Sequence, residues 1–440
     1  MAETPKKYPM WDTIINYLDA AEKMFGGDKQ EKAGKGIFQK SFLTIFSSFL
    51  RKLYEAEAQG IPKIMFNFCI PPELFRVFDR TYPICEEVGS VGLTVIGTQH
   101  IKYIELAEEN GIAPEQCNAQ KIWIGAMMAN EIFKPDGIVY ASQPCDSTNI
   151  LYQVMQNWYK VPTYTLDVPY WAHDPDSEFY DERTVPYFVN QLKGFIVWAE
   201  KNFGLKFDSE HFRHMMELSN QAREAVLELN ELMRAIPAPL PSLTSFNTYV
   251  ALLTSAGTQA AADYCKFVRD EAANNAKQKI SPLQERGKEE KFRVIWIYLP
   301  IFWDFMLFDW MERKFGAVSV MDLLGYNLAQ PVDLSSKNKM FEGLARTTLD
   351  IPMGVQSRGP AEYYLDYLIN VVKTYKADCA IYGGHLGCKH SWAIANLLKE
   401  ELYEVTGVPT LIFEVDAMDN RPVTSRMIKA KLKTFFTEML

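Results

Sequence analysis

A glycine-rich segment near the end of the sequence, ADCAIYGGHLGCKHSW, contains residue types that support metal or redox chemistry. It carries two cysteines, Cys379 and Cys388, on either side of a Gly-Gly-His-Leu-Gly turn. A cysteine thiolate is both a nucleophile and a metal ligand. The segment lies where a predicted strand ends and a predicted helix begins. It therefore predicts a metal or cofactor site at the end of that strand.

The other residues of this segment have two predicted roles. Gly384 and Gly387 have no side chain, so we expect their backbone to approach a bound cofactor closely. His385, Lys389 and His390 are the candidate proton donors, because histidine titrates near neutral pH and all three lie beside the thiols. These three are our predicted catalytic residues.

Cysteines also follow predicted strands elsewhere in the chain. Cys69 and Cys145 end strand candidates in the first half of the sequence, as Cys388 does in the second half. Each precedes a predicted helix, whose amino-terminal dipole favours a thiolate over a thiol. Functional groups collect at the carboxyl ends of parallel strands. Thiolates from both halves would thus surround one cleft, which is typical of an iron–sulfur site.

The remaining cysteines give weaker signals. Cys265 lies inside a helical pattern and is expected to be a packing residue, while burial is the default for Cys379 inside a strand. Cys85 follows a predicted apolar helix, and Cys117 lies in a loop before the next predicted helix. Neither position alone distinguishes a ligand from a packing residue.

A zinc site is the alternative reading of the same residues. Cys388 with His385 or His390 would provide part of a tetrahedral site. Compact cysteine pairs are otherwise absent from the sequence. His211 and His214 lie three positions apart on one predicted helix, without an evident third ligand, so surface positions explain them better.

Composition limits the class of protein. The chain has 440 residues, a net charge of -9 and 48% hydrophobic content. An acidic chain argues against nucleic-acid binding, and no apolar run reaches the length of a membrane span. The start lacks the apolar core of a signal peptide, so we expect a cytoplasmic protein. Stable disulfides are not expected there, and seven is an odd number of cysteines.

The elements expected to position these residues form four parts. Residues 1–60 are predicted to be a helical N-terminal segment, residues 61–185 a first α/β lobe, residues 186–288 a helical connection and residues 289–440 a second α/β lobe. The strand candidates are KIMFNFC, GLTVIGT, DGIVYASQPC and PTYTLDVPY, then FRVIWIYLP, AVSVMD, ADCAIYGG and PTLIFEVD. This order predicts two parallel sheets. The GGDKQEKAGKGI loop lacks Walker spacing, so we predict no ATP site.

Five motifs resemble those of the 2-hydroxyacyl-CoA dehydratase and benzoyl-CoA reductase family in order and spacing: FCIPPELF, PEQCNAQ, PDGIVYASQPCDSTN, GGHLGCKHS and VPTLIFEVDAMDNRPV. Within it, the chain looks most like the larger cluster-bearing subunit of ATP-dependent benzoyl-CoA reductases. The resemblance implies two flavodoxin-like lobes holding an iron–sulfur cluster. It also implies a smaller homologous subunit, an aryl-CoA substrate and an activator with its own cluster, which alone uses ATP.

The resemblance also implies a ligand set. Cys117, Cys145 and Cys388 match the three positions that hold one [4Fe-4S] cubane. With Cys69, Cys85 and Cys379 the chain would supply six thiolates, as for a double-cubane [8Fe-9S] cluster, and we hypothesise that all six are ligands. Three alternatives for the function remain open at this point: a 2-hydroxyacyl-CoA dehydratase subunit, a non-catalytic electron-transfer or scaffold subunit, and a zinc-stabilised binding protein.

Overall fold

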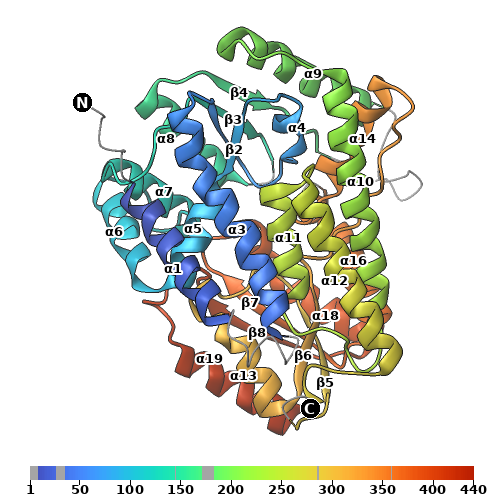
Figure 1. The fold of residues 1–440 in the computed structure, drawn as a ribbon. Helices are drawn as coiled ribbons and strands as arrows, with labels where there is room; N and C mark the ends of the chain where they lie inside the picture. The colour runs from blue at the N-terminus through green and yellow to red at the C-terminus, as the bar shows by residue number, and fades with distance from the viewer. Residues whose placement is uncertain (1–7, 26–34, 144, 171–182, 285–286, 358) are drawn as a thin grey trace.

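The computed structural model describes residues 8–25, 35–143, 145–170, 183–284, 287–357 and 359–440. Most of the GGDKQEKAGKGI loop, rejected above as an ATP site, lies outside these residues. The chain builds two lobes on separate sheets, seen in the upper and lower parts of Figure 1. Long helices run between the lobes along one side of the molecule.

The first lobe is built on a four-stranded parallel sheet in the order β2-β1-β3-β4. Its inner strands are short and fully or almost fully buried, as expected for strands that helices cover on both faces. The strands are β1 (Lys63–Phe66), β2 (Tyr82–Cys85), β3 (Gly137–Ala141) and β4 (Thr163–Leu166). Its helical elements are α4 (Glu73–Arg76), α5 (Glu86–Ile96), η1 (Thr98–His100), α6 (Ile101–Glu109), α7 (Asn118–Met128) and α8 (Asp146–Tyr159).

One predicted strand of this lobe is wrong. The segment GLTVIGT was expected to be a strand, but its first five residues belong to helix α5. The strand is instead Tyr82–Cys85, which pairs with β1 residue by residue. A short apolar run does not distinguish a buried strand from a buried helix, and this is the reason for the error. As a consequence Cys85 lies at the end of a strand and not after a helix.

The second lobe repeats this topology with the strand order β6-β5-β7-β8. The predicted fold class, two flavodoxin-like parallel lobes, is therefore confirmed. The strands are β5 (Phe292–Trp296), β6 (Ala317–Asp322), β7 (Cys379–His385) and β8 (Thr410–Val415). The helical elements are η3 (Phe302–Asp304), α13 (Met306–Phe315), α14 (Lys337–Asp350), α15 (Gly354–Ser357), α16 (Ala361–Thr374), α17 (Lys389–Ala393), α18 (Ala395–Thr406), α19 (Ser425–Thr434) and η4 (Phe435–Met439).

The lobes are connected by helices α9 (Thr184–Phe203), α10 (Ser209–Leu232), α11 (Thr244–Ser255) and α12 (Gln259–Gln278), and the chain opens with α1 (Pro9–Phe25) and α3 (Lys35–Ala58). A buried arginine ties α10 to both lobes. Arg223 pairs with Glu73 of the first lobe at 3.0 Å and donates to the Gln330 carbonyl of the second at 3.2 Å. Separating a buried charge from its partner costs free energy, so this contact holds the lobes in a defined arrangement.

None of the described helices combines the length and the apolar character that crossing a bilayer requires.

Candidate metal and substrate site

Four cysteines occupy the position just before a helix begins. They are Cys85 before α5, Cys117 before α7, Cys145 before α8 and Cys388 before α17. The first N–H groups of a helix have no partner within the helix, so this position surrounds a sulfur atom with potential donors. Cys145 has such a donor: its sulfur accepts a hydrogen bond from the Thr148 N–H at 3.3 Å.

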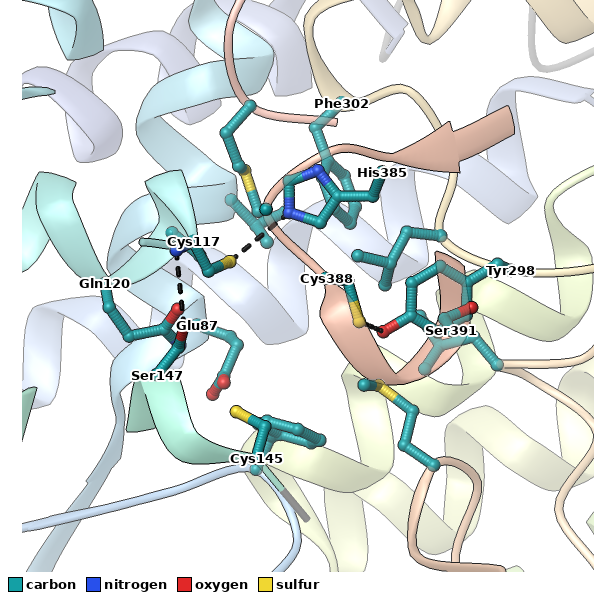
Figure 2. A pocket seen from close by; sticks show the side chains of 18 of the residues that line it. Glu87, Cys117, Gln120, Cys145, Ser147, Tyr298, Phe302, His385, Cys388 and Ser391 are labelled. Carbon is teal, nitrogen blue, oxygen red and sulfur yellow. Dashed lines mark hydrogen bonds between the residues drawn. The ribbon is translucent and has the colours of Figure 1, made fainter. Parts of the chain in front are cut away.

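Three of these cysteines line one pocket between the lobes. Cys117 and Cys145 come from the first lobe and Cys388 from the second, and Figure 2 shows their sulfur atoms around a common space. Helices α3 and α11 close the pocket with apolar side chains, as do loops of both lobes. The wall includes Phe46, Phe68, Phe246, Tyr249, Leu253 and Phe302. The pocket thus combines three thiols with an apolar chamber.

His385 connects the two lobes across this pocket. Its Nε2 lies 3.3 Å from the Cys117 sulfur, and its Nδ1 lies 3.2 Å from an Asp416 carboxylate oxygen. The backbone N–H of Ala417 also points at Nδ1, at 3.1 Å. Burial lowers the pKa of His385, but the charges of Asp416 and Cys117 outweigh burial and hold that pKa well above its ordinary value. Both ring nitrogens therefore have protein partners, unlike those of a proton donor facing substrate.

The other two pocket thiols also have polar partners. The Tyr298 hydroxyl lies 3.1 Å from the Cys388 sulfur, and the Thr148 hydroxyl lies 3.0 Å from the Cys145 sulfur. Burial raises the pKa of the Cys145 thiol, and the charges of Cys117 and Cys388 raise it further. Burial also raises the pKa of Cys388. Negative charge on these sulfurs therefore needs a compensating cation.

The glycines of the GGHLG turn serve packing between protein segments. A Cβ at Gly387 would lie 2.8 Å from the Cys117 Cα, so the absent side chain lets the loops of the two lobes meet. A Cβ at Gly384 would overlap the Trp392 ring, which fills the space beside it. The prediction that Gly384 leaves room for a cofactor is therefore corrected: the space is taken by a tryptophan of the same chain.

Lys389 and His390 line the mouth of the pocket, and both are exposed. The ammonium of Lys389 pairs with the Asp146 carboxylate at 3.0 Å, with both side chains more than half exposed. This pair crosses between the lobes beside Cys145. Surface pairs of this kind contribute little stability, so Lys389 can exchange its partner for a ligand at the mouth.

Comparison with known proteins connects this geometry to a family. The family model for the D-component of 2-hydroxyglutaryl-CoA dehydratase matches residues 67–440. This chain belongs to that family. A benzoyl-CoA reductase subunit of Thauera aromatica is 23% identical over 342 residues, 75% of this chain and 78% of that protein.

Two dehydratase subunits are similar to the same degree. The (R)-phenyllactyl-CoA dehydratase alpha subunit of Clostridium sporogenes is 23% identical over 72% of this chain and 75% of its own length. The (R)-2-hydroxyisocaproyl-CoA dehydratase alpha subunit of Clostridioides difficile is 24% identical over 86% of this chain and 90% of its own. The dehydratase and reductase family thus includes relatives of both reaction types.

The thiol geometry suits a cluster better than a single ion. Among the described residues, the sulfurs of Cys117, Cys145 and Cys388 are not all within 4.8 Å of one another. Zinc–sulfur bonds of about 2.3 Å would require separations of about 3.8 Å. A polynuclear iron–sulfur group needs more widely spaced thiolates, which helix starts and hydroxyl donors then stabilise. The residues present therefore fit an iron–sulfur cluster.

The structure argues against the hypothesis that all six cysteines are ligands of one cluster. Cys379 begins β7, at the opposite end of that strand from His385, and packs in an apolar cluster with Val294 and Phe413. A ligand role for Cys379 is corrected for this reason, because the strand separates it from the pocket. Cys265 is buried in the helical connection, where it was expected to be a packing residue.

Cys69 and Cys85 lie close behind the pocket without lining it. Both are buried, and the Cys85 sulfur lies 2.9 Å from a Glu87 carboxylate oxygen. Burial raises the pKa of Cys69, and the charges of Glu87 and Cys145 raise it further. Cys69 therefore lies near these two pocket residues. Cys85 is the last residue of strand β2 and contacts Glu87, which lines the pocket.

Glu87, at the start of α5, is a pocket residue that the sequence motifs did not single out, whereas its neighbour Glu86 was a weak candidate proton donor beside Cys85. Glu87 lines the pocket, and burial raises its pKa to about 7. Glu86 is buried, and burial raises its pKa well above the ordinary value. Its carboxylate accepts a hydrogen bond from the Tyr152 hydroxyl at 2.6 Å. Among the residues that the structure describes, one oxygen of each carboxyl has no hydrogen-bond partner. The sequence signal that could have indicated Glu87 is its position directly after Cys85 and Glu86.

Proposed function

We propose that this chain is the iron–sulfur subunit of an ATP-dependent benzoyl-CoA reductase, which reduces the ring of an aryl-CoA thioester to a cyclic dienoyl-CoA. One observation carries the proposal: Cys117, Cys145 and Cys388, from two lobes, converge on one apolar pocket. These three residues are the proposed ligands of a [4Fe-4S] cluster. The likeness to the benzoyl-CoA reductase of Thauera aromatica supports this choice of reaction.

The wall of the pocket suits the acyl part of such a substrate. Phe246, Tyr249 and Phe302 line it, together with aliphatic residues of α11 and the second lobe. Aromatic side chains bind a planar apolar ring by stacking and by edge contacts. A chamber of this kind also excludes water from a reactive intermediate. The substrate ring is therefore proposed to bind against α11.

The reaction requires two electrons and two protons for each ring. An iron–sulfur cluster supplies low-potential electrons singly, which ring reduction needs because aromatic stabilisation is lost. Glu87 is the proposed proton donor, since its pKa of about 7 leaves a large protonated fraction at neutral pH. Glu86 and the Tyr152 hydroxyl behind it hold further protons. Lys389 and His390, at the mouth, are proposed to contact the coenzyme A portion.

Other subunits are part of the proposal. The relatives are named as subunits of larger enzymes. We propose a smaller homologous subunit as the partner of this chain. A separate activator, with its own iron–sulfur cluster, would hydrolyse ATP and deliver electrons.

A 2-hydroxyacyl-CoA dehydratase subunit is the second candidate, and a specific observation favours it. The Glu87 and Gln120 side chains both line the pocket, and one buried oxygen of each lacks a hydrogen-bond partner within the described part of the chain. Two free acceptors suit a substrate that brings a hydroxyl donor. A 2-hydroxyacyl thioester has that group, and its dehydration to an enoyl thioester consumes no net electrons.

The ratio of reductant to product separates these candidates. The chain would be produced anaerobically with its partner subunit and activator, then supplied with ATP, a reductant and either benzoyl-CoA or a 2-hydroxyacyl-CoA. A reductase consumes two electrons for each dienoyl-CoA formed. Consumption of only catalytic amounts of reductant with enoyl-CoA as product would establish the dehydratase. Absence of acyl-CoA binding to this chain would instead indicate an electron-transfer subunit.

A further inference from the structure

Each of the three pocket cysteines has its own side-chain partner. His385 Nε2 lies 3.3 Å from Cys117, the Tyr298 hydroxyl 3.1 Å from Cys388, and the Thr148 hydroxyl 3.0 Å from Cys145. His385, Tyr298 and Thr148 are all at most 4% exposed. Hydrogen bonds shielded from water in this way act more strongly on charge than exposed ones.

We propose that His385, Tyr298 and Thr148 each donate a hydrogen bond to one ligand sulfur and together set the reduction potential of the cluster. This inference rests on the proposed function, because it takes the three cysteines as ligands. The three are positioning residues, which act on the cluster through the sulfur atoms.

The direction of each hydrogen bond follows from the chemistry of the sulfur. A ligand thiolate has no proton, so the hydroxyls of Tyr298 and Thr148 are the donors when the cluster is bound. In the neutral imidazole, Nδ1 of His385 accepts from the backbone N–H of Ala417 and the proton is on Nε2. An imidazolium also carries a proton on Nε2, so His385 donates to Cys117 in either form.

The position of His385 is itself fixed. Asp416 lies beside its Nδ1, and one oxygen of Asp416 accepts from the Met418 and Asp419 N–H groups at 2.8 and 2.9 Å. The turn after β8 therefore holds the imidazole of β7 against a cysteine of the other lobe. Outer partners that orient a metal site in this way tune its properties.

Donation to a ligand sulfur stabilises the reduced cluster, because reduction adds negative charge that the sulfur atoms share. Loss of one donor should therefore lower the potential. We expect about a tenfold smaller equilibrium constant for reduction, which is about 59 mV for one electron. Because the donors contact different sulfurs, the shifts of two substitutions should add.

The test is an anaerobic redox titration followed by electron paramagnetic resonance on the full chain with its partner subunit. Y298F removes one oxygen atom, T148V replaces a hydroxyl by a methyl group, and H385L removes the imidazole donor. The exposed His214 on α10 provides a control, H214L. We expect lower potentials in Y298F, T148V and H385L, a further decrease in Y298F/T148V, and no change in H214L.

The outcomes separate this inference from the proposed function. A wild-type protein without iron and sulfide overturns the proposed function. A loaded cluster whose potential is the same in wild type, Y298F and T148V overturns this inference alone. If H385L fails to hold the cluster, Y298F and T148V still decide, and loss of an exchangeable-proton coupling near the cluster in Y298F provides the independent spectroscopic support.

Discussion

At the scale of single residues, the three pocket cysteines differ from Cys265 and Cys379 in what surrounds them. Cys117, Cys145 and Cys388 line a pocket and have polar partners at their sulfur atoms. Cys379, in contrast, packs among apolar side chains. A thiolate needs donors or a cation, so a ligand role belongs to the first group.

Alanine substitution of the cysteines should separate the two groups. C117A, C145A and C388A each remove a proposed ligand, and we expect them to lose most of the iron from about four atoms per chain. C379A and C265A serve as matched controls, because they remove buried thiols outside the pocket and should lose some stability but no iron. Iron and sulfide analysis of anaerobically purified protein measures both effects. Iron loss in C379A alone would contradict this assignment.

Glu87 should make the stability of the protein depend on pH. Burial raises its pKa from 4.5 to about 7 in the folded chain. Between these values the folded state binds more protons than the unfolded state, so stability falls as pH rises through this window. E87Q removes the titrating carboxyl and with it this pH dependence. The stability of E87Q relative to wild type should therefore increase from pH 4.5 to pH 7. Thermal unfolding of the cluster-free protein at several pH values measures the difference, and a constant difference would refute the expectation.

At the scale of elements, the loop after β7 and the start of α7 meet only because a glycine separates them. The Cβ of an alanine at Gly387 would lie 2.8 Å from the Cys117 Cα, closer than such atoms approach. The loops of both lobes would then move apart. The contact is thus part of the geometry that brings Cys388 to Cys117.

G387A should therefore reduce cluster binding more than stability. We expect the variant to hold less than about half of the wild-type iron, because one ligand loop is displaced from the other two. G407A is the matched control: Gly407 has a φ of 71°, and no atom of the described residues lies within 4 Å of the position its Cβ would take. That change should cost about 1 kcal/mol of stability without loss of iron. Equal iron in both variants would contradict this role of Gly387.

At the scale of the whole molecule, the pocket is a contact between two similar lobes. The lobes share a strand order and present the loops after their strands to the same space. Arg223 and the Cys117–His385 contact also connect them. A cluster with ligands in both lobes would add a further connection. Because it would bind only the folded state, it would stabilise that state.

Removal of iron should therefore loosen both lobes together at the pocket. Hydrogen exchange with mass spectrometry should detect faster exchange in the segments around Cys117, Cys145 and Cys388 after chelation. The central strands β1 and β5 are largely buried, contribute no residue to the pocket wall and should exchange as before. Faster exchange in one lobe only would mean that the cluster has ligands from that lobe alone.

The sequence by itself determined the strands of the second lobe, the two-lobe fold class and the cysteines that follow strands. These features depend on neighbours within a few residues: apolar runs, helix-start residues and turns. The same local signals misassigned GLTVIGT, because a short apolar run is compatible with a helix and with a strand.

Only the tertiary structure decided which cysteines share a pocket. Cys117 and His385 are 268 positions apart, and their contact depends on how two complete lobes pack. The same packing excluded Cys379, filled the space beside Gly384 with Trp392 and brought Glu87 to the pocket wall. Local propensity indicates which segments form strands and helices. The approach of distant loops is set by side-chain packing across the whole molecule.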